Sequence, residues 1–167
     1  PNVPEQIKPG ANEHVAMSVA ARGVQVYECR LRQDNAATEW VFIAPEADMF
    51  DTRGRMAGKH FAGPRWESSD GSRIVGTVKA RMDAPEAGAI QWLLLSAKSE
   101  SGEGVLSKVT SVQRVNTSGG AAPDAGCSRS LAGTVARVPY TATYIFLAPK
   151  TATAPFAAST TRNDGGY

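Results

Sequence analysis

The residue types that most often build reactive centres are scarce in this chain. Its 167 residues include two cysteines and two histidines, and neither Cys29 nor Cys127 has a second cysteine or a histidine at metal-ligand spacing. No GxSxG or SxxK motif occurs, and no glycine-rich segment lies between a strand and a helix as a dinucleotide site requires. Local motifs therefore predict no catalytic residue, no metal ion and no cofactor.

Long runs of one kind of residue are also missing. The 18 basic and 16 acidic residues are scattered and leave a formal net charge of +2, so no basic stretch could follow a nucleic-acid backbone. The longest apolar stretch lies around residues 92–95 and is far shorter than the roughly 18 residues that span a bilayer. The sequence thus predicts neither a nucleic-acid partner nor a transmembrane segment.

The two cysteines have two interpretations. One could be a reactive thiol of a cytosolic protein, or the pair could form a structural disulfide in an oxidising compartment, and we favour the disulfide. Closing so long a loop would stabilise the fold by roughly 4–5 kcal/mol in the chain-entropy model. The chain also begins at Pro1 without an initiator methionine, as after removal of a leader, although a trimmed chain would begin in the same way. We therefore expect a secreted or periplasmic protein.

Apolar and polar residues alternate along most of the chain, as they do in half-buried strands. Turn residues separate these segments about every 8–12 residues, which indicates a sandwich or a barrel. We predict an all-β fold, a single antiparallel sandwich or barrel-like domain with long loops and one disulfide. Residues 1–13 form an extended N-terminal arm, 14–147 the β domain, and 148–167 a low-complexity C-terminal tail. The strands are expected at 14–20, 23–32, 38–44, 48–50, 55–57, 73–82, 89–99, 105–116 and 134–147.

The segment 59–67, followed by 68–72, is the richest in chemically useful side chains. In a strand, His60 and Trp66 share one face while Arg65 and Glu67 share the other, although a Gly-Pro break interrupts this parity. One interpretation is a pocket wall, in which Trp66 stacks against a ligand and His60 and Glu67 anchor it. The other places Trp66 in the core, His60 against the backbone, and an Arg65–Glu67 pair on the surface.

A second polar group lies on the predicted strand 105–116. Period-two alternation places Lys108, Arg114 and Asn116 on one face of this strand. That face either contacts solvent or lines a cavity.

Several segments taken together resemble the family called domain of unknown function 3455. The resemblance extends in order from Val15 to Phe146 and implies a secreted or periplasmic protein of bacteria or fungi, with no established activity. It also implies that Cys29 pairs with Cys127. It nominates a site made of His60, Trp66 and Glu67 together with Gln113 and Arg114. The segments that carry it are GVQVYEC (23–29), WVFIAPEADMFD (40–51), GKHFAGPRWE (58–67), DGS (70–72), WLLL (92–95), GVLSKVTSVQRVNTSGG (104–120), GC (126–127) and VPYTATYIF (138–146).

Three functions are compatible with these features. The first is a module that binds a small molecule or a glycan in a cleft lined by Trp66, Trp92, Tyr27 and His60. The second is a structural subunit that forms an oligomer or filament by adding its N-terminal arm or C-terminal tail to a neighbour's sheet edge. The third is a hydrolase whose site is assembled from distant residues. We predict binding ahead of assembly and catalysis.

Overall fold

Eight antiparallel strands form the fold in the computed structural model, which describes residues 3–33 and 37–150. One single-turn 3-10 helix precedes the first strand and another precedes the last. In chain order the elements are η1 (Glu5–Ile7), β1 (Glu13–Leu31), β2 (Thr38–Phe50), β3 (Met56–Phe61), β4 (Arg65–Ser68), β5 (Arg73–Met82), β6 (Trp92–Ser101), β7 (Ser111–Gly119), η2 (Arg129–Leu131) and β8 (Val135–Pro149). No helix in this described part of the chain has the length and apolar composition needed to cross a membrane.

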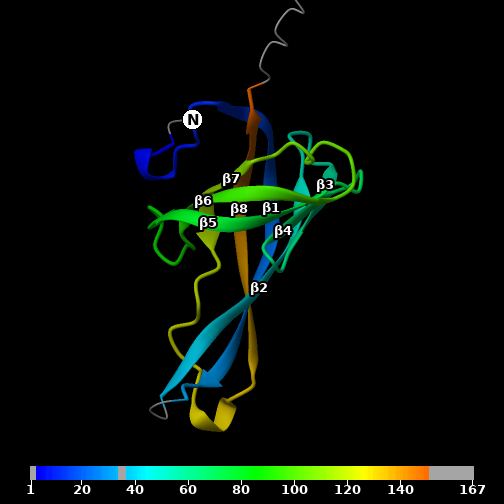
Figure 1. The fold of residues 1–167 in the computed structure, drawn as a ribbon. Helices are drawn as coiled ribbons and strands as arrows, with labels where there is room; N and C mark the ends of the chain where they lie inside the picture. The colour runs from blue at the N-terminus through cyan, green and yellow to red at the C-terminus, as the bar shows by residue number, and fades with distance from the viewer. Residues whose placement is uncertain (1–2, 34–36, 151–167) are drawn as a thin grey trace, which may run out of the picture.

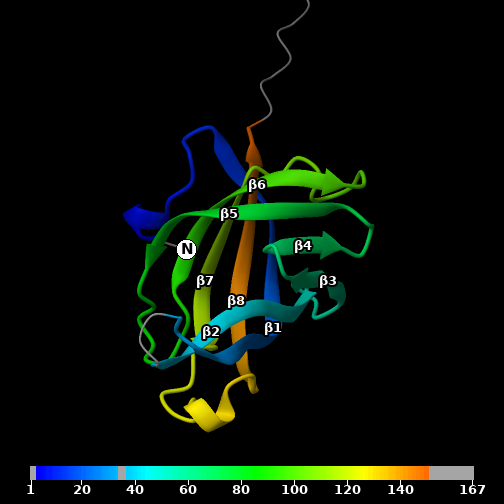
Figure 2. The same cartoon turned by 60° about the horizontal axis from the view of Figure 1, so that its bottom comes forward.

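Each strand pairs with its neighbours along the chain, and β8 pairs with β1 to close an eight-stranded barrel (Figure 1 and Figure 2). The predicted antiparallel β domain is confirmed, and of the two architectures the chain adopts the barrel. Closure gives every strand two hydrogen-bonded neighbours over at least part of its length. A barrel of this size has an interior that side chains can fill or that can hold one small ligand.

Gly23 does not separate two strands, so this part of the strand prediction was wrong. β1 continues through it for 19 residues. A Cβ atom at Gly23 would lie 2.0 Å from the backbone oxygen of Glu46 on β2. Gly23 therefore permits close approach of two paired strands, which is a common use of glycine within a sheet.

The first half of another predicted strand is a loop. Residues 105–110 alternate in polarity as a strand would, but hydrogen bonds from Ser107 N–H to Gly104 O and from Val109 N–H to Leu106 O turn the chain. Leu106 and Val109 are buried against the barrel core. The alternation thus belongs to a loop that caps the barrel, and β7 begins at Ser111.

This capping loop defines the closed end of the barrel. Leu106 is fully buried there, and Asp70 connects the loop to the turn between β4 and β5. The Asp70 carboxylate accepts hydrogen bonds from the Ser72 N–H (3.0 Å), the Ser72 hydroxyl (2.7 Å) and the Val105 N–H (2.9 Å). The Ser72 hydroxyl in turn accepts one from the Leu106 N–H at 3.2 Å. Buried apolar side chains and hydrogen bonds between the loops therefore close this end of the barrel together.

The segment before β1 packs against the outer face of the barrel. Ile7 is fully buried among outward-facing side chains that include Leu94 on β6 and Ile145 on β8. The Gln113 side-chain amide donates a hydrogen bond to the Ile7 carbonyl at 2.7 Å. Residues 3–12 thus lie on the chain's own barrel.

β1, β2 and β8 continue past the other strands as a narrow extension (Figure 1). There Cys29 on β1 forms the predicted disulfide with Cys127 in the β7–β8 loop, with their Cα atoms 5.3 Å apart. The Trp40 indole N–H donates to Ala125 O and the Thr38 hydroxyl to Cys127 O, each at 3.0 Å. The long loop before β8 is therefore held by covalent and polar contacts. Residues 34–36, between the predicted strands 23–32 and 38–44, and the predicted tail beyond residue 150 lie outside the described residues.

Candidate functional site

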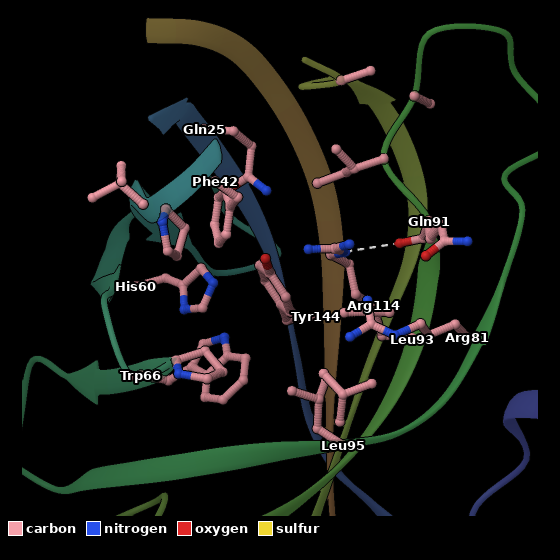
Figure 3. A pocket seen from close by; sticks show the side chains of 18 of the residues that line it. Gln25, Phe42, His60, Trp66, Arg81, Gln91, Leu93, Leu95, Arg114 and Tyr144 are labelled. Atoms are coloured by element: carbon pink, nitrogen blue, oxygen red, sulfur yellow. Dashed lines mark hydrogen bonds between the residues drawn. The ribbon is translucent and has the colours of Figure 1, made fainter. Parts of the chain in front are cut away.

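A cavity of about 560 Å³ occupies the barrel interior at the end opposite the capping loop. We call this the open end; it includes the β3–β4 turn, the β5–β6 loop and the start of the β7–β8 loop. Aromatic and aliphatic side chains supply most of the wall, and Figure 3 shows how ten of the lining residues face the space. The apolar part includes Tyr27, Phe42, Trp66, Val78, Ile90, Leu93, Leu95 and Tyr144, and the longer polar side chains are Gln25, His60, Arg81, Gln91 and Arg114.

His60 and Trp66 are direct cross-strand partners on β3 and β4. Their rings stack with centroids 4.6 Å apart and an interplanar angle of 15°. Tyr144 from β8 meets both, at 4.8 Å from His60 and 5.6 Å from Trp66. Gly76 on β5 makes room for the indole, because a Cβ there would lie 2.8 Å from the Trp66 ring. Sequence parity predicted the shared face of His60 and Trp66, and the structure places both on the cavity wall.

His60 is a neutral side chain in this setting. Its Nδ1 lies 2.8 Å from the carbonyl oxygen of Arg65, so Nδ1 carries the proton and donates it, and Nε2 is the acceptor nitrogen. Burial lowers the pKa of His60 to about 3, and the nearby charge of Arg114 acts in the same direction. Because the ring stays neutral at physiological pH, it contributes an aromatic face and one acceptor to the cavity.

Arg114 lies midway along β7 and faces the interior. Its register partners are Leu93 on β6 and Tyr144 on β8. Its Nε donates to the Gln91 carbonyl oxygen at 2.9 Å, the dashed line in Figure 3. Burial raises the pKa of Tyr144, while the charge of Arg114 opposes that rise. The cavity thus contains one positioned guanidinium group.

Two buried polar atoms of the cavity wall have no hydrogen-bond partner within the described residues, namely Gln25 Oε1 and Trp66 Nε1. The tyrosine hydroxyls are in contrast satisfied. Tyr27 donates to the Gly120 carbonyl oxygen, and the Tyr140 and Tyr144 hydroxyls share a hydrogen bond of 3.2 Å. Since buried polar atoms are normally paired, Gln25 and Trp66 are the groups that a ligand could satisfy.

The residues predicted from sequence divide into two groups. His60, Trp66, Tyr27 and Arg114 come together around the cavity. Three others do not line it. Gln113 and Trp92 lie on the outer face of the wall near Ile7, and Glu67 pairs with Arg73 at 3.2 Å on the outer surface.

Gln25 is the main cavity residue that the sequence interpretation missed. Its signal was its place on β1 two residues before Tyr27, which gives both residues the same parity. Gln91 was missed because it lies in a loop, where alternation carries no information about direction. Among the described residues, no three His, Cys, Asp or Glu side chains converge as metal ligands.

A family model described as protein of unknown function (DUF3455) matches residues 9–148. The chain belongs to the DUF3455 family. This confirms the resemblance, and the DUF3455 match covers the barrel from β1 to all but the last residue of β8. No curated protein and no solved structure matches the chain.

Proposed function

We propose that this protein binds a small organic molecule in the cavity at the open end of its barrel. The observation that carries the proposal is the cavity itself, whose volume of about 560 Å³ lies within the roughly 300–1,000 Å³ typical of small-molecule sites. The predominance of apolar and aromatic wall supports a ligand with an apolar body rather than a glycan. Gln25 Oε1 and Trp66 Nε1 support the presence of a polar group on that ligand.

The chemistry of the wall supports binding ahead of hydrolysis. Among the described lining residues there is no Ser, Thr, Cys, Lys, Asp or Glu, so the cavity offers neither an ordinary nucleophile nor a carboxylate acid or base. His60 is a weak base for catalysis at neutral pH because its pKa is about 3. The N-terminal arm packs on its own barrel over residues 3–12, which argues against assembly through this arm.

We propose further that the protein works in a secreted or periplasmic setting. The disulfide between Cys29 and Cys127 supports this, since such bonds persist in oxidising compartments. Protein isolated from its native host and alkylated under denaturing, non-reducing conditions should contain no free thiol. Two alkylated cysteines would contradict the assignment.

Ligand binding can be tested with Nile red, a neutral apolar dye whose fluorescence rises when it leaves water. The wild-type protein should saturate with dye at one site per chain. Val78→Trp fills part of the cavity and should weaken binding by about tenfold or more, because the dye and the indole compete for the same volume.

Thr77→Trp is the matched control. Thr77 precedes Val78 on β5 but is exposed on the other face of the wall. This variant should bind Nile red within about twofold of the wild type. Absence of saturable binding in folded wild-type protein, or equal weakening by both variants, would overturn the proposal.

A further inference from the structure

The charged residues around the cavity bear on the class of ligand that it would bind. Three arginines of the described chain are partly buried: Arg65, Arg73 and Arg114. Arg65 and Arg73 both pair with Glu100, at 2.7 and 3.0 Å. Arg114 forms no ion pair with any described residue, and no carboxylate belongs to the described cavity wall. Of these three arginines, Arg114 is therefore the one whose charge no described carboxylate balances. A partly buried charge without a partner is costly.

The two acidic residues of the β5–β6 loop, Asp83 and Glu86, do not balance the charge of Arg114. Asp83 accepts a hydrogen bond from the Gln91 amide at 3.1 Å, and Glu86 accepts one from the Ser118 hydroxyl at 3.4 Å. Both acidic residues are exposed to solvent and neither lines the cavity. Arg81, which does line the cavity, adds a second positive charge from its exposed position near the end of β5.

The other cavity groups leave this positive charge in place. Burial raises the pKa of Tyr27 and of Tyr144, so both stay protonated, and the lowered pKa of His60 keeps it neutral. The positive charge of Arg114 lowers the pKa of all three groups. It therefore disfavours protonation of His60 and favours ionisation of the two tyrosines. The open end is thus electropositive, with Arg114 as its partly buried charge and Arg81 as an exposed one.

The remaining donors of Arg114 suit a planar oxyanion. One guanidinium N–H is committed to the Gln91 carbonyl oxygen, and this contact orients the group beside Tyr144 (Figure 3). A guanidinium group presents paired donors that match the two oxygens of a carboxylate. Around it, Leu93, Leu95 and Trp66 offer aliphatic and aromatic surface to an apolar body.

We propose that the ligand is a small organic acid with a planar or apolar body, whose carboxylate is bound by Arg114. This inference rests on the proposed function, because it names the ligand class of the same cavity. It follows from a guanidinium group without an ion-pair partner among the described residues, the lack of a carboxylate in the described wall, and the apolar surface that surrounds them.

Isothermal titration with cinnamate and cinnamamide tests the inference, because the two compounds share a body and differ in charge. The wild type should bind cinnamate about tenfold more tightly than cinnamamide. Acetate, which is a carboxylate without an apolar body, should not bind measurably.

Arg114→Gln should remove the preference for cinnamate over cinnamamide. Arg53→Gln removes the same charge from the exposed β2–β3 turn and should keep the full preference. Circular dichroism verifies that each variant is folded, and Arg114→Lys, which retains the charge but loses the paired donors, should show an intermediate preference.

The outcomes separate the two proposals. If the wild type binds Nile red and cinnamamide but shows no preference for cinnamate, the inference fails and the binding function stands. The inference also fails, and the binding function stands, if Arg114→Gln retains the preference for cinnamate or if acetate binds as tightly as cinnamate. If none of the compounds binds to folded wild-type protein, the proposed function itself fails. The wild-type comparison decides the matter even if Arg114→Gln does not fold.

Discussion

At the closed end of the barrel, Leu106 and Val109 fill the interior and Asp70 connects two loops, whereas at the open end the interior contains a cavity faced by Arg114, His60 and Gln25. The same strands form both ends, so the difference arises from the loops and from the size and polarity of the inward side chains. The closed end is stabilised by packing. The open end has less packing and is instead held by the disulfide and by hydrogen bonds from the extension.

The largest expected effect is the loss of the disulfide. Replacing Cys29 and Cys127 together by alanine should lower the free energy of unfolding by about 4 kcal/mol, because the 98-residue loop between them is no longer closed in the unfolded chain. Urea denaturation measures the loss. Hydrogen exchange should accelerate in residues 120–135 and not in the capping loop 102–110. Equal acceleration at both ends would show that they are not held independently.

The next effect is a pH dependence that belongs to the open end. The pKa of His60 is lowered to about 3 by burial, so between pH 6.5 and 3 the unfolded chain binds a proton that the folded chain does not. Stability should therefore fall as the pH drops through that window, by roughly 4 kcal/mol at its lower limit. His60→Gln should flatten the dependence in urea titrations from pH 7 to 3. An unchanged slope in this variant would assign the loss to other groups.

A pair of leucine truncations compares the packing of the two ends directly. Leu106→Ala at the closed end should lower the free energy of unfolding by about 3 kcal/mol, because it leaves a void in a filled interior. Leu93→Ala at the open end should cost less, about 2 kcal/mol, since that side chain already faces unfilled space on one side. Denaturant titration of both variants gives the two values, and a larger loss for Leu93→Ala would reverse the comparison.

The smallest effect concerns Asp70. Hydrogen bonds from Ser72 and Val105 lower the pKa of this carboxyl to about 2. The folded state therefore favours the carboxylate, and this contribution to stability is lost as the pH falls from 3.8 towards 2. Asp70→Asn should lack this acid step while retaining the one due to His60. If it instead lost the His60 step, the two ends would be coupled.

Alternation predicted much of the fold, because it reports which side of a strand each side chain faces. Tyr140, Ala142, Tyr144 and Phe146 occupy alternate positions of the predicted strand 134–147, and all four are in the core. Alternation could not predict the cavity. Leu93 and Leu95 face inward, but whether the space beside them is filled depends on side chains from other strands meeting in three dimensions.

The same physics explains which candidates separated. Gln113 and Arg114 were nominated together, but neighbours on a strand face opposite sides, so one lies under the arm and the other in the cavity. Trp92 and Trp66 are both large aromatic residues, yet the register of β6 directs Trp92 outward. The side of the barrel wall that a residue faces is therefore determined by strand register and not by its chemical type.

Neighbouring residues of β7 face opposite sides of the barrel wall. Gln113 faces outward and donates a hydrogen bond to the Ile7 carbonyl oxygen, whereas Arg114 faces the interior. A one-residue deletion early in this strand would place the cation beneath Ile7 and the amide toward the interior, and a one-residue insertion there would likewise turn Arg114 away from the cavity. Substitutions can adjust this barrel gradually, but changes in strand length cannot. Tolerated changes of length should therefore be confined to the loops, such as the segment 121–126, where no paired strand has to keep its frame.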